Sequence, residues 1–346
     1  MNEYLDFLVS NWSSPVLLLV VLVSLATLAR GADRLVDSAV AMSRRFGVPR
    51  VVVGATIVSL GTTMPEAVVS VFAAVQGRSE MALGNAVGSI ICDTGLILGI
   101  GCLIAPLPLD MRVVNRQGWV NVGTGFLLVL VCLPWADPSA AFVTGGTVSQ
   151  AVGWGFLALL LIYLVWSVRL ARAGVGTDAD DVEGALPDTM SMVLGLFAGL
   201  VMVIVSAALL ISSAAELAER INVPPSIIAA TLVAFGTSLP ELVVVVTATW
   251  KGHGELAVGN VIGADVLNVL FVVGGAAAVT ATGLHADPVF FVAYFPAMLF
   301  LLLVFRIGVW TAKNGTLGRP VGMVLLATYV VLTGLSYLTS IPQPTG

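Results

Sequence analysis

Apolar stretches of about 20 residues recur along the whole chain, and they limit its possible folds more than any other feature. A stretch of this length crosses the hydrocarbon core of a bilayer as one helix. Of the 346 residues, 58% are hydrophobic and only 10% are charged, which is far from the composition of soluble proteins. The sequence therefore predicts an all-α polytopic membrane protein without a sizeable soluble domain.

We expect ten transmembrane helices in two sets of five. The longest polar connection, residues 173–188, is acidic and separates a first half (1–172) from a second half (189–346). The first apolar segment has no basic residues before it, which favours a membrane helix over a cleaved signal. The ten helices are predicted at residues 14–43, 50–76, 81–105, 118–135, 150–171, 189–218, 224–250, 255–281, 288–307 and 320–340.

The basic residues predict the orientation in the membrane. Only Arg78 and Arg220 fall on one side of this arrangement, and cytoplasmic loops are enriched in Lys and Arg. Both termini are therefore expected on the non-cytoplasmic side of the cell (inner) membrane, with the acidic connection in the cytoplasm. The basic side carries Arg44, Arg45, Arg50, Arg112, Arg116, Arg169, Arg172, Lys251, Arg306, Lys313 and Arg319.

Several partner classes find no support in the composition. The 15 lysines and arginines form no dense run, which argues against nucleic-acid binding. The three cysteines lie in or near predicted spans and indicate neither a disulfide framework nor a zinc site. Nothing in the sequence requires an oligomer.

The two halves repeat each other at an offset of 175 residues. Residues 46–66, FGVPRVVVGATIVSLGTTMPE, align without gaps on residues 221–241, INVPPSIIAATLVAFGTSLPE, with nine of 21 positions identical. The same offset places EMALGNAVGSIICDTGLILG (80–99) on ELAVGNVIGADVLNVLFVVG (255–274). Because five is an odd number, two five-helix repeats must have opposite orientations. Inverted repeats with interrupted helices are typical of secondary transporters, whose sites lie near the bilayer midplane.

The motifs GTTMPE (61–66) and GTSLPE (236–241) each place a glutamate beside a helix-breaking proline. A proline lacks an N–H, so a carbonyl about one turn earlier loses its helical partner. Such carbonyls, together with hydroxyls and a carboxylate, are the hard oxygen ligands that Ca²⁺ prefers. The expected carbonyls are near Val58, Ser59, Thr62, Val233, Ala234 and Thr237, and the hydroxyls and acids are those of Thr62, Thr63, Glu66, Thr237, Ser238 and Glu241.

The helices that follow these motifs are expected to form the other wall of the site. GNAVG (84–88) and GNVIG (259–263) are GxxxG patterns, which allow close helix contact. Ser89 and Asp93 are four residues apart and share a helix face. The matching second-half positions are Ala264 and Asn268. Three buried carboxylates close together cannot all stay ionised without cations, so we expect protons to compete with metal ions.

These paired motifs resemble the two α-repeats of the sodium/calcium exchanger branch of the Ca²⁺:cation antiporter superfamily, of the prokaryotic type without regulatory domains. The likeness covers nearly all ten predicted spans. It implies an inverted five-plus-five fold in the bilayer that exchanges Ca²⁺ for Na⁺ by alternating access. It also implies no enzymatic activity and no prosthetic group. The long first and sixth helices resemble the family's sliding gate, where Asp33, Arg34 and Asp37 are expected to pair with one another.

The resemblance also implies a set of ion ligands. Glu66 and Glu241 would hold Ca²⁺ with the carbonyls of Thr62 and Thr237, and Asp93 and Asn268 would complete the central layer. One flanking Na⁺ site would use Ser59, Thr62, Thr63, Glu66 and the position of Ala264; the other would use Ala234, Thr237, Ser238, Glu241 and Ser89.

Three departures from the family pattern affect these expectations. Asp93 and Asn268 reverse the usual order of Asn and Asp, which keeps the number of carboxylates. Ala264 replaces a serine and removes a hydroxyl from one Na⁺ site. Asp265 replaces an asparagine, as an extra ligand or as a partner that positions other ligands.

Other functions stay open at this point. One is a Ca²⁺ antiporter driven by H⁺, or by K⁺ alongside Na⁺. The hydroxyl-rich flanking sites favour Na⁺ over these ions. In addition, the proton-driven branch carries a Glu soon after GNA, where this chain has Val87 and Gly88. A passive channel is disfavoured because antiparallel pseudo-symmetry suits alternating access. An intramembrane enzyme is disfavoured because the sequence has no HExxH or Ser/His arrangement.

Overall fold

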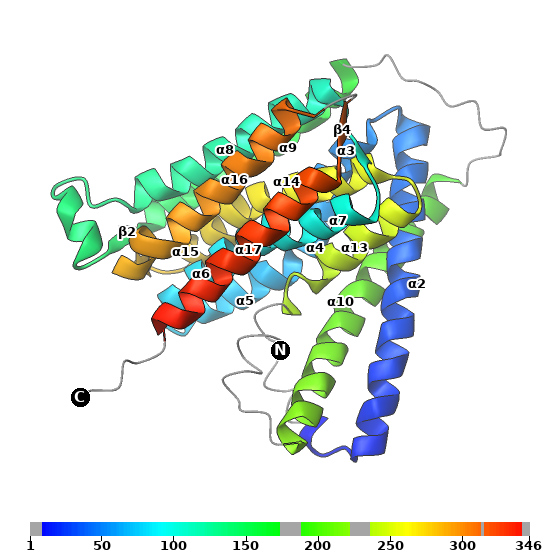
Figure 1. The fold of residues 1–346 in the computed structure, drawn as a ribbon, viewed down its shortest axis with the longest axis horizontal. Coiled ribbons are helices and arrows are strands. Elements are labelled where there is room, and N and C mark those ends of the chain that lie inside the picture. Colours follow the sequence, from blue (N-terminus) through cyan, green and yellow to red (C-terminus); the bar gives the residue numbers. More distant parts are fainter. Residues whose placement is uncertain (1–8, 174–187, 222–235, 313–314, 341–346) are drawn as a thin grey trace.

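The computed structural model describes residues 9–173, 188–221, 236–312 and 315–340, and these are almost entirely helical (Figure 1). This confirms the all-α class. The α-helices are α2 (Ser14–Phe46), α3 (Arg50–Val53), α4 (Ser59–Thr62), α5 (Met64–Val75), α6 (Ser79–Ile91), α7 (Leu98–Ile104), α8 (Met111–Cys132), α9 (Gln150–Ala173), α10 (Thr189–Arg220), α13 (Leu239–Trp250), α14 (Gly254–Leu267), α15 (Gly274–Ala278), α16 (Phe295–Trp310) and α17 (Arg319–Ser340).

Shorter elements interrupt or connect these helices. The π-helical segments are η1 (Gly54–Val58), η2 (Cys92–Ile97), η5 (Asn268–Val273) and η6 (Phe290–Tyr294), and η3 (Pro138–Phe142) is a 3₁₀ turn. Each predicted helix range contains helix within the described residues, although for the range 224–250 this is only its second part, α13. The predicted start of the fourth helix at 118 is wrong, because Asp110 caps α8 by accepting from the N–H groups of Arg112 and Val113.

The described helices make this a multi-pass membrane protein. Six helical runs are long and apolar enough to cross a bilayer, and the bent pair Arg50–Thr62 and Met64–Val75 would be a seventh. Burial differs greatly among them. In the most apolar part of each run, 94% of Gly254–Ala278 and 67% of Ser79–Ile104 are buried, against 22% of Thr189–Arg220. The first two runs therefore lie at the centre of the bundle.

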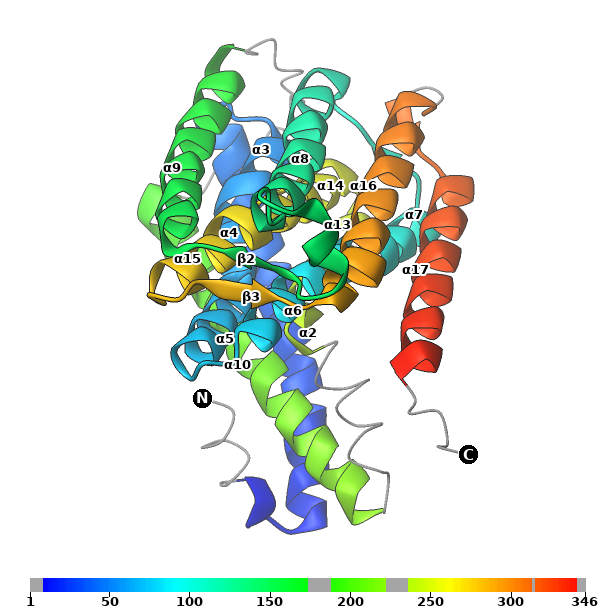
Figure 2. The ribbon, with the colours of Figure 1, turned by 90° about the vertical axis from the view of Figure 1, so that its left-hand side faces the viewer.

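Helices α2 and α10 lie along each other and project together from the rest of the bundle (Figures 1 and 2). They cross closely at Gly31 and Gly199, where a β-carbon on Gly199 would lie 2.7 Å from the amide nitrogen of Leu35. At one end of the pair, Arg220 donates to the backbone oxygens of Trp12 and Ser10 at 2.7 and 3.1 Å. The two helices are thus tied together as one unit.

Matching helices in the two halves have matching bounds. Helices α5 and α13 begin at 64 and 239 and end at 75 and 250, an offset of 175 at both ends, and α6 and α14 begin at 79 and 254. Two short antiparallel ribbons, which the sequence does not predict, follow the same scheme. Strand β1 (Leu107–Pro108) pairs with β4 (Thr316–Leu317), and β2 (Gly146–Val148) pairs with β3 (Leu284–Ala286) (Figure 2). Strands β1 and β3 follow the matching helices α7 and α15. Each ribbon therefore corresponds to the other ribbon when the two halves are superposed.

Candidate functional site

The proline motifs form a helix bend and a helix start near the middle of the bundle. The axis turns by 45° between Arg50–Thr62 and Met64–Val75. Pro65 stands in the first turn of α5 and Pro240 in the first turn of α13, where a missing N–H removes no helical hydrogen bond. Each proline therefore stands where a helix begins, and neither disrupts the helix that it begins.

Each of these helix starts holds a glutamate. Glu66 lies in the first turn of α5 and Glu241 in the first turn of α13. The positive end of a helix dipole favours an anion at this position. Both side chains are only 1% exposed, as is Asp93 in η2. The sequence prediction that these three acids are buried is confirmed.

Most carboxylate oxygens of Glu66, Asp93 and Glu241 lack partners within the described part of the chain. Both oxygens of Glu66, both oxygens of Asp93 and Oε2 of Glu241 have no hydrogen-bond donor there. Burying an ionised carboxylate is expensive unless another group compensates its charge. Unpartnered, buried oxygens of this kind fit cations as their natural partners.

The acids do not make a complete ion site by themselves. The charges of Glu241 and Asp93 act on Glu66. However, among the residues that the structure describes, no three His, Cys, Asp or Glu side chains lie close enough to hold one metal ion. This departs from the expected close trio of carboxylates. Because Ca²⁺ takes six to eight oxygens, an ion here would draw most of its ligands from hydroxyls, carbonyls, amides or water.

Hydrogen bonds connect each proline motif to the glycine motif of the other half. The Thr62 hydroxyl donates to Oδ1 of Asn260 at 3.5 Å, and the Thr237 hydroxyl donates to Oδ1 of Asn85 at 3.4 Å. The two bonds are related by the repeat offset, since 62 + 175 = 237 and 85 + 175 = 260. The structure therefore brings together residues 198 and 152 positions apart in the sequence, in a pairwise matching arrangement.

The predicted hydroxyl ligands are buried around this junction. Thr63 donates to Oε1 of Glu241 at 3.5 Å. The Ser59 carbonyl accepts from the N–H of Thr63 at 2.9 Å, which corrects the expectation that the bend leaves this carbonyl free. Ala234 lies outside the described residues. Ser59, Thr62, Thr63, Ser238 and Ser89 are buried, and Thr237 is half-buried.

Asn85 and Asn260 show where the two halves differ. The Asn85 amide donates to the Ser70 hydroxyl at 3.0 Å and to the backbone oxygen of Glu66 at 3.3 Å. The amide nitrogen Nδ2 of Asn260 is buried and has no partner in the described residues. The cause is the residue at position 245, which is Val where the first half has Ser70. The first half thus has a hydroxyl that accepts from the asparagine nitrogen, and the second half does not.

Asp93 and Asn268 begin or lie in π-helical segments. Asp93 is the second residue of η2 and Asn268 the first of η5. Such segments are rare and often occur at functional sites, because they widen the helix and turn side chains out of the regular pattern. Oδ1 of Asn268 is buried and unpartnered in the described residues, like the Asp93 oxygens. Both mirrored positions therefore offer free oxygens.

Asp265 has partners on two other elements. Its Oδ2 accepts from the Thr94 hydroxyl at 2.6 Å and from the Asn121 amide at 3.0 Å, while its Oδ1 has no partner among the described residues. Asn121 comes from α8, which carries none of the repeated motifs. Sequence reasoning misses it, although an asparagine in the middle of an apolar helix is the available signal. Of the two predicted roles for Asp265, these contacts favour the positioning one.

Comparison with known proteins gives a consistent result. The sequence model of the family described as sodium/calcium exchanger protein matches residues 16–169 and again residues 191–338. The inner membrane protein YrbG of Escherichia coli is 30% identical over 331 residues, which cover 92% of this chain and 96% of YrbG. The sodium/calcium exchanger MaX1 of Methanosarcina acetivorans is 28% identical, over 90% of this chain and 96% of MaX1.

A solved structure is similar over nearly the whole fold. The sodium-calcium exchanger NCX_Mj, soaked with Na⁺ and without Ca²⁺, superposes with a TM-score of 0.79 at 27% identity. The match covers 95% of this chain and all of NCX_Mj. The fold similarity thus extends beyond the motifs to the complete helix arrangement.

Proposed function

Because the chain belongs to the sodium/calcium exchanger protein family of membrane cation antiporters, we propose that it exchanges Ca²⁺ for Na⁺ across the membrane by alternating access. Ca²⁺ and Na⁺ are its transported ions, and it is not an enzyme. The observation that carries the proposal is the mirrored pair of buried glutamates with unpartnered oxygens, joined across the halves by the Thr62–Asn260 and Thr237–Asn85 hydrogen bonds.

The donor set favours a hard cation bound at the centre. Glu66 and Glu241 bring two negative charges, which one Ca²⁺ or several Na⁺ neutralise. The carbonyls of Thr62 and Thr237 add neutral oxygens of the kind that Ca²⁺ takes. Asp93 and Asn268 complete this central layer. The hydroxyl-rich positions around it, together with Ala234, are the proposed Na⁺ ligands: Ser59, Thr62, Thr63, Ser89, Thr237 and Ser238.

Three observations support an inverted ten-span arrangement with alternating access. The matching helices α5 and α13 share an offset of 175 residues, and the strands β1 and β3 follow the matching helices α7 and α15. The family sequence model matches the chain twice, once in each predicted half. Helices α2 and α10 form a tied pair with little burial, so the pair can slide past the central helices as a gate.

The distribution of basic residues supports the proposed orientation. Arg306 stacks over Trp119 and bonds to Asn115, which brings the end of α16 to the start of α8. Ribbon β1–β4 adds the start of α17 to the same end of the bundle. We propose that this end faces the cytoplasm and that both termini lie on the other side.

Ion flux in sealed vesicles tests the proposal. Uptake of radiolabelled Ca²⁺ is measured while gradients of Na⁺, K⁺ and H⁺ are imposed one at a time. We expect an outward Na⁺ gradient to drive Ca²⁺ above its equilibrium level. A channel would only dissipate a Ca²⁺ gradient, and failure of the Na⁺ gradient to drive uptake would overturn the proposed coupling.

Charge-removing variants test the site itself. Glu66→Gln and Glu241→Gln keep the side-chain shape but remove the negative charge, so we expect Ca²⁺ flux to fall to background while the protein stays folded. Glu80→Gln is the matched control, because Glu80 is an exposed acid in the first turn of α6. Normal flux in either of the first two variants would remove the central assignment.

A second candidate is a Ca²⁺ antiporter coupled to H⁺, or to K⁺ alongside Na⁺. Ala264 supplies no hydroxyl to one Na⁺ site, and Asp265 adds a fourth buried acid. Both features fit proton coupling better than the usual family residues do. Ca²⁺ uptake driven by a pH gradient alone, with no response to Na⁺, would favour this candidate.

A further inference from the structure

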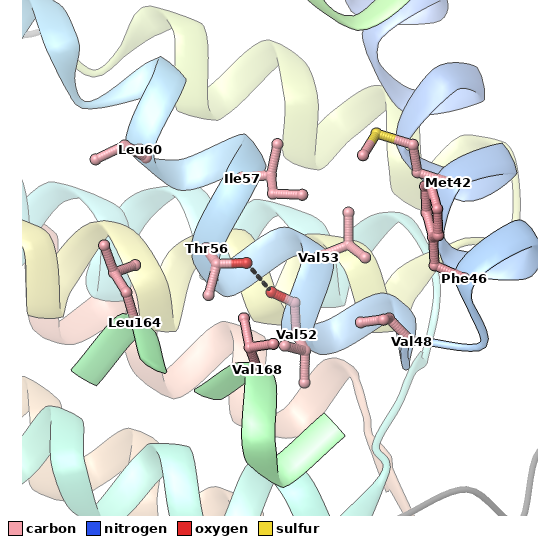
Figure 3. A pocket seen from close by; sticks show the side chains of 10 residues that line it. All are labelled: Met42, Phe46, Val48, Val52, Val53, Thr56, Ile57, Leu60, Leu164 and Val168. Carbon is pink, nitrogen blue, oxygen red and sulfur yellow. Dashed lines mark hydrogen bonds between the residues drawn. The ribbon is translucent and has the colours of Figure 1, made fainter. Parts of the chain in front are cut away.

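An apolar groove runs along the outer side of the first helix bend (Figure 3). It has a volume of about 250 Å³ and lies between the end of α2, the segment Val48–Leu60 and one face of α9. Its walls are open to the surroundings, since Phe46 is 54% exposed and Val168 is 43% exposed. None of the buried acids lines it, so it is distinct from the ion site.

The walls of the groove suit a hydrocarbon chain. Among the described residues that line it, Thr56 alone has a polar side chain. Its hydroxyl is already used, because it donates to the backbone oxygen of Val52 at 2.7 Å (Figure 3). A polar ligand would lose its hydrogen bonds to water here without replacement. An acyl chain makes no hydrogen bonds to water, so it loses none in the groove.

The length and position of the groove match one leaflet of a bilayer. From Arg50 to Leu60 the helical chain rises about 15 Å, at about 1.5 Å per residue. Half of a hydrocarbon core of about 30 Å is about 15 Å. The groove therefore reaches from the basic end of the bundle, where a headgroup would lie, to about the depth of the ion site.

A second cavity has four polar or charged residues in its lining, and two of its other lining residues are close in sequence to residues of the groove. It has a volume of about 430 Å³ and is lined by Pro49, next to Val48, and by Leu170, two residues after Val168. Arg112 and Arg116, one turn apart on α8 and both exposed, line it as well. Asp110 also lines it, but its carboxylate caps α8 through hydrogen bonds of 3.0 and 3.4 Å to backbone N–H groups.

We propose that the two cavities hold one anionic phospholipid, with an acyl chain in the groove and its phosphate at Arg112 and Arg116. Planar guanidinium groups bind phosphate oxygens in pairs. In a zwitterionic headgroup the phosphate charge is cancelled by a cation of the same headgroup, which weakens its attraction to the two arginines. The lipid chain would press against η1, which leads directly into the motif that carries Ser59 and Glu66. The proposal depends on the placement of the basic end at a membrane surface and not on which ions are transported.

Lipid retention by the purified full-length protein tests this proposal. Native mass spectrometry would compare phosphatidylglycerol with phosphatidylcholine of the same acyl chains. At about 1 kcal/mol for each arginine near an anionic surface, two arginines should favour the anionic lipid about 10- to 30-fold. We expect the double variant Arg112→Gln, Arg116→Gln to reduce this preference to about threefold or less, whereas Arg78→Gln, at the other end, leaves it unchanged.

A groove-filling variant tests the acyl-chain position. Val168→Trp should lower retention of both lipids, and Leu159→Trp, on the opposite face of α9, should not. Inorganic phosphate should fail to displace the lipid, because it lacks the chain. Equal retention of the two headgroups by the wild type, unchanged retention in the double arginine and Val168→Trp variants, or displacement by inorganic phosphate would each overturn the proposal.

Discussion

Gly263, the last glycine of GNVIG, lies at a close contact between two helices and beside Ser59, a proposed ion ligand. At this point α14 crosses the bend of the first half. A β-carbon on Gly263 would lie 2.4 Å from the Ser59 hydroxyl oxygen and 2.5 Å from both Cα and the backbone oxygen of Ala55. Two of the three obstacles are backbone atoms, which cannot rotate away. Gly263→Ala must therefore separate the two helices locally.

The size of the effect follows from these distances. Ordinary contacts of a β-carbon begin at 3.4 Å, so the shortfall against Ser59 is 3.4 − 2.4 = 1.0 Å. Overpacking of this kind costs about 1–3 kcal/mol. Ser59 is also a proposed Na⁺ ligand, and a ligand displaced by about 1 Å loses much of its contact with the ion. A loss of about 1.4 kcal/mol would raise the Na⁺ concentration for half-maximal transport about tenfold.

Two measurements separate these consequences. Thermal unfolding in detergent reports the packing cost, and Na⁺-dependent Ca²⁺ uptake in vesicles reports the ion site. Gly259→Ala is the informative second variant, because its β-carbon would lie 2.2 Å from the Val51 backbone oxygen. It should destabilise the protein with less effect on Na⁺ dependence. Gly155→Ala, at an exposed position of α9, should change neither quantity.

The reasoning would be refuted by a Gly263→Ala protein that melts like the wild type and keeps its Na⁺ dependence. It would also fail if Gly155→Ala were equally damaging. In the first case, the close crossing of α14 over the bend is not what the packing argument assumes. In the second case, any added methyl group would have the same effect, and the specific contact with Ser59 would explain nothing.

Three further predictions follow. Ala264→Ser should strengthen Na⁺ dependence in the vesicle assay, and an unchanged Na⁺ titration would show that this position is not a ligand. Ser70→Ala should lower the free energy of unfolding by about 0.5–1.5 kcal/mol, because the Asn85 amide loses a hydrogen-bond partner; an unchanged melting curve would contradict this. Lys251→Met should cost about 0.2–1 kcal/mol for each of its two exposed ion pairs. Partial burial disfavours the charge of Lys251, but its bonds to the carboxylates of Asp33 and Asp37 outweigh this and raise its pKa. The contribution of these ion pairs to stability therefore persists through neutral pH, and it is lost only as the pH rises through the raised pKa of Lys251.

Much of the helix arrangement could be predicted because its signals are local. Apolar length, the Pro65 and Pro240 breaks and the repeat at 175 residues are all visible in the sequence, and the helices lie where these features place them. The start of α8 was not predictable from hydropathy, since its first turns carry Arg112 and Arg116. The cap by Asp110 determines that boundary instead.

Contacts between distant helices could not be predicted in the same way. Asp33 and Asp37 were expected to pair with their neighbour Arg34, but Lys251 lies 3.1 and 2.9 Å from their carboxylates. That bond needs α13 to end beside α2, which depends on the whole fold. The hydrogen bond of 3.0 Å between the Asn121 amide and Asp265 depends in the same way on α8 packing against α14.

The two halves of the chain match at the hydrogen bonds around the candidate ion site, and they differ at contacts farther from it. The matching Thr62–Asn260 and Thr237–Asn85 bonds build one symmetric centre. Under the proposed alternating access of an inverted repeat, such symmetry would make the two access states nearly equal in free energy. Lys251 has no counterpart, because the matching residue 251 − 175 = 76 is Gln76. In the proposed cycle, its bonds to α2 would therefore stabilise the state seen here and not the state in which the two halves exchange their roles. Such unmatched contacts, each worth about 1 kcal/mol or less, would set which face of the membrane the empty site prefers.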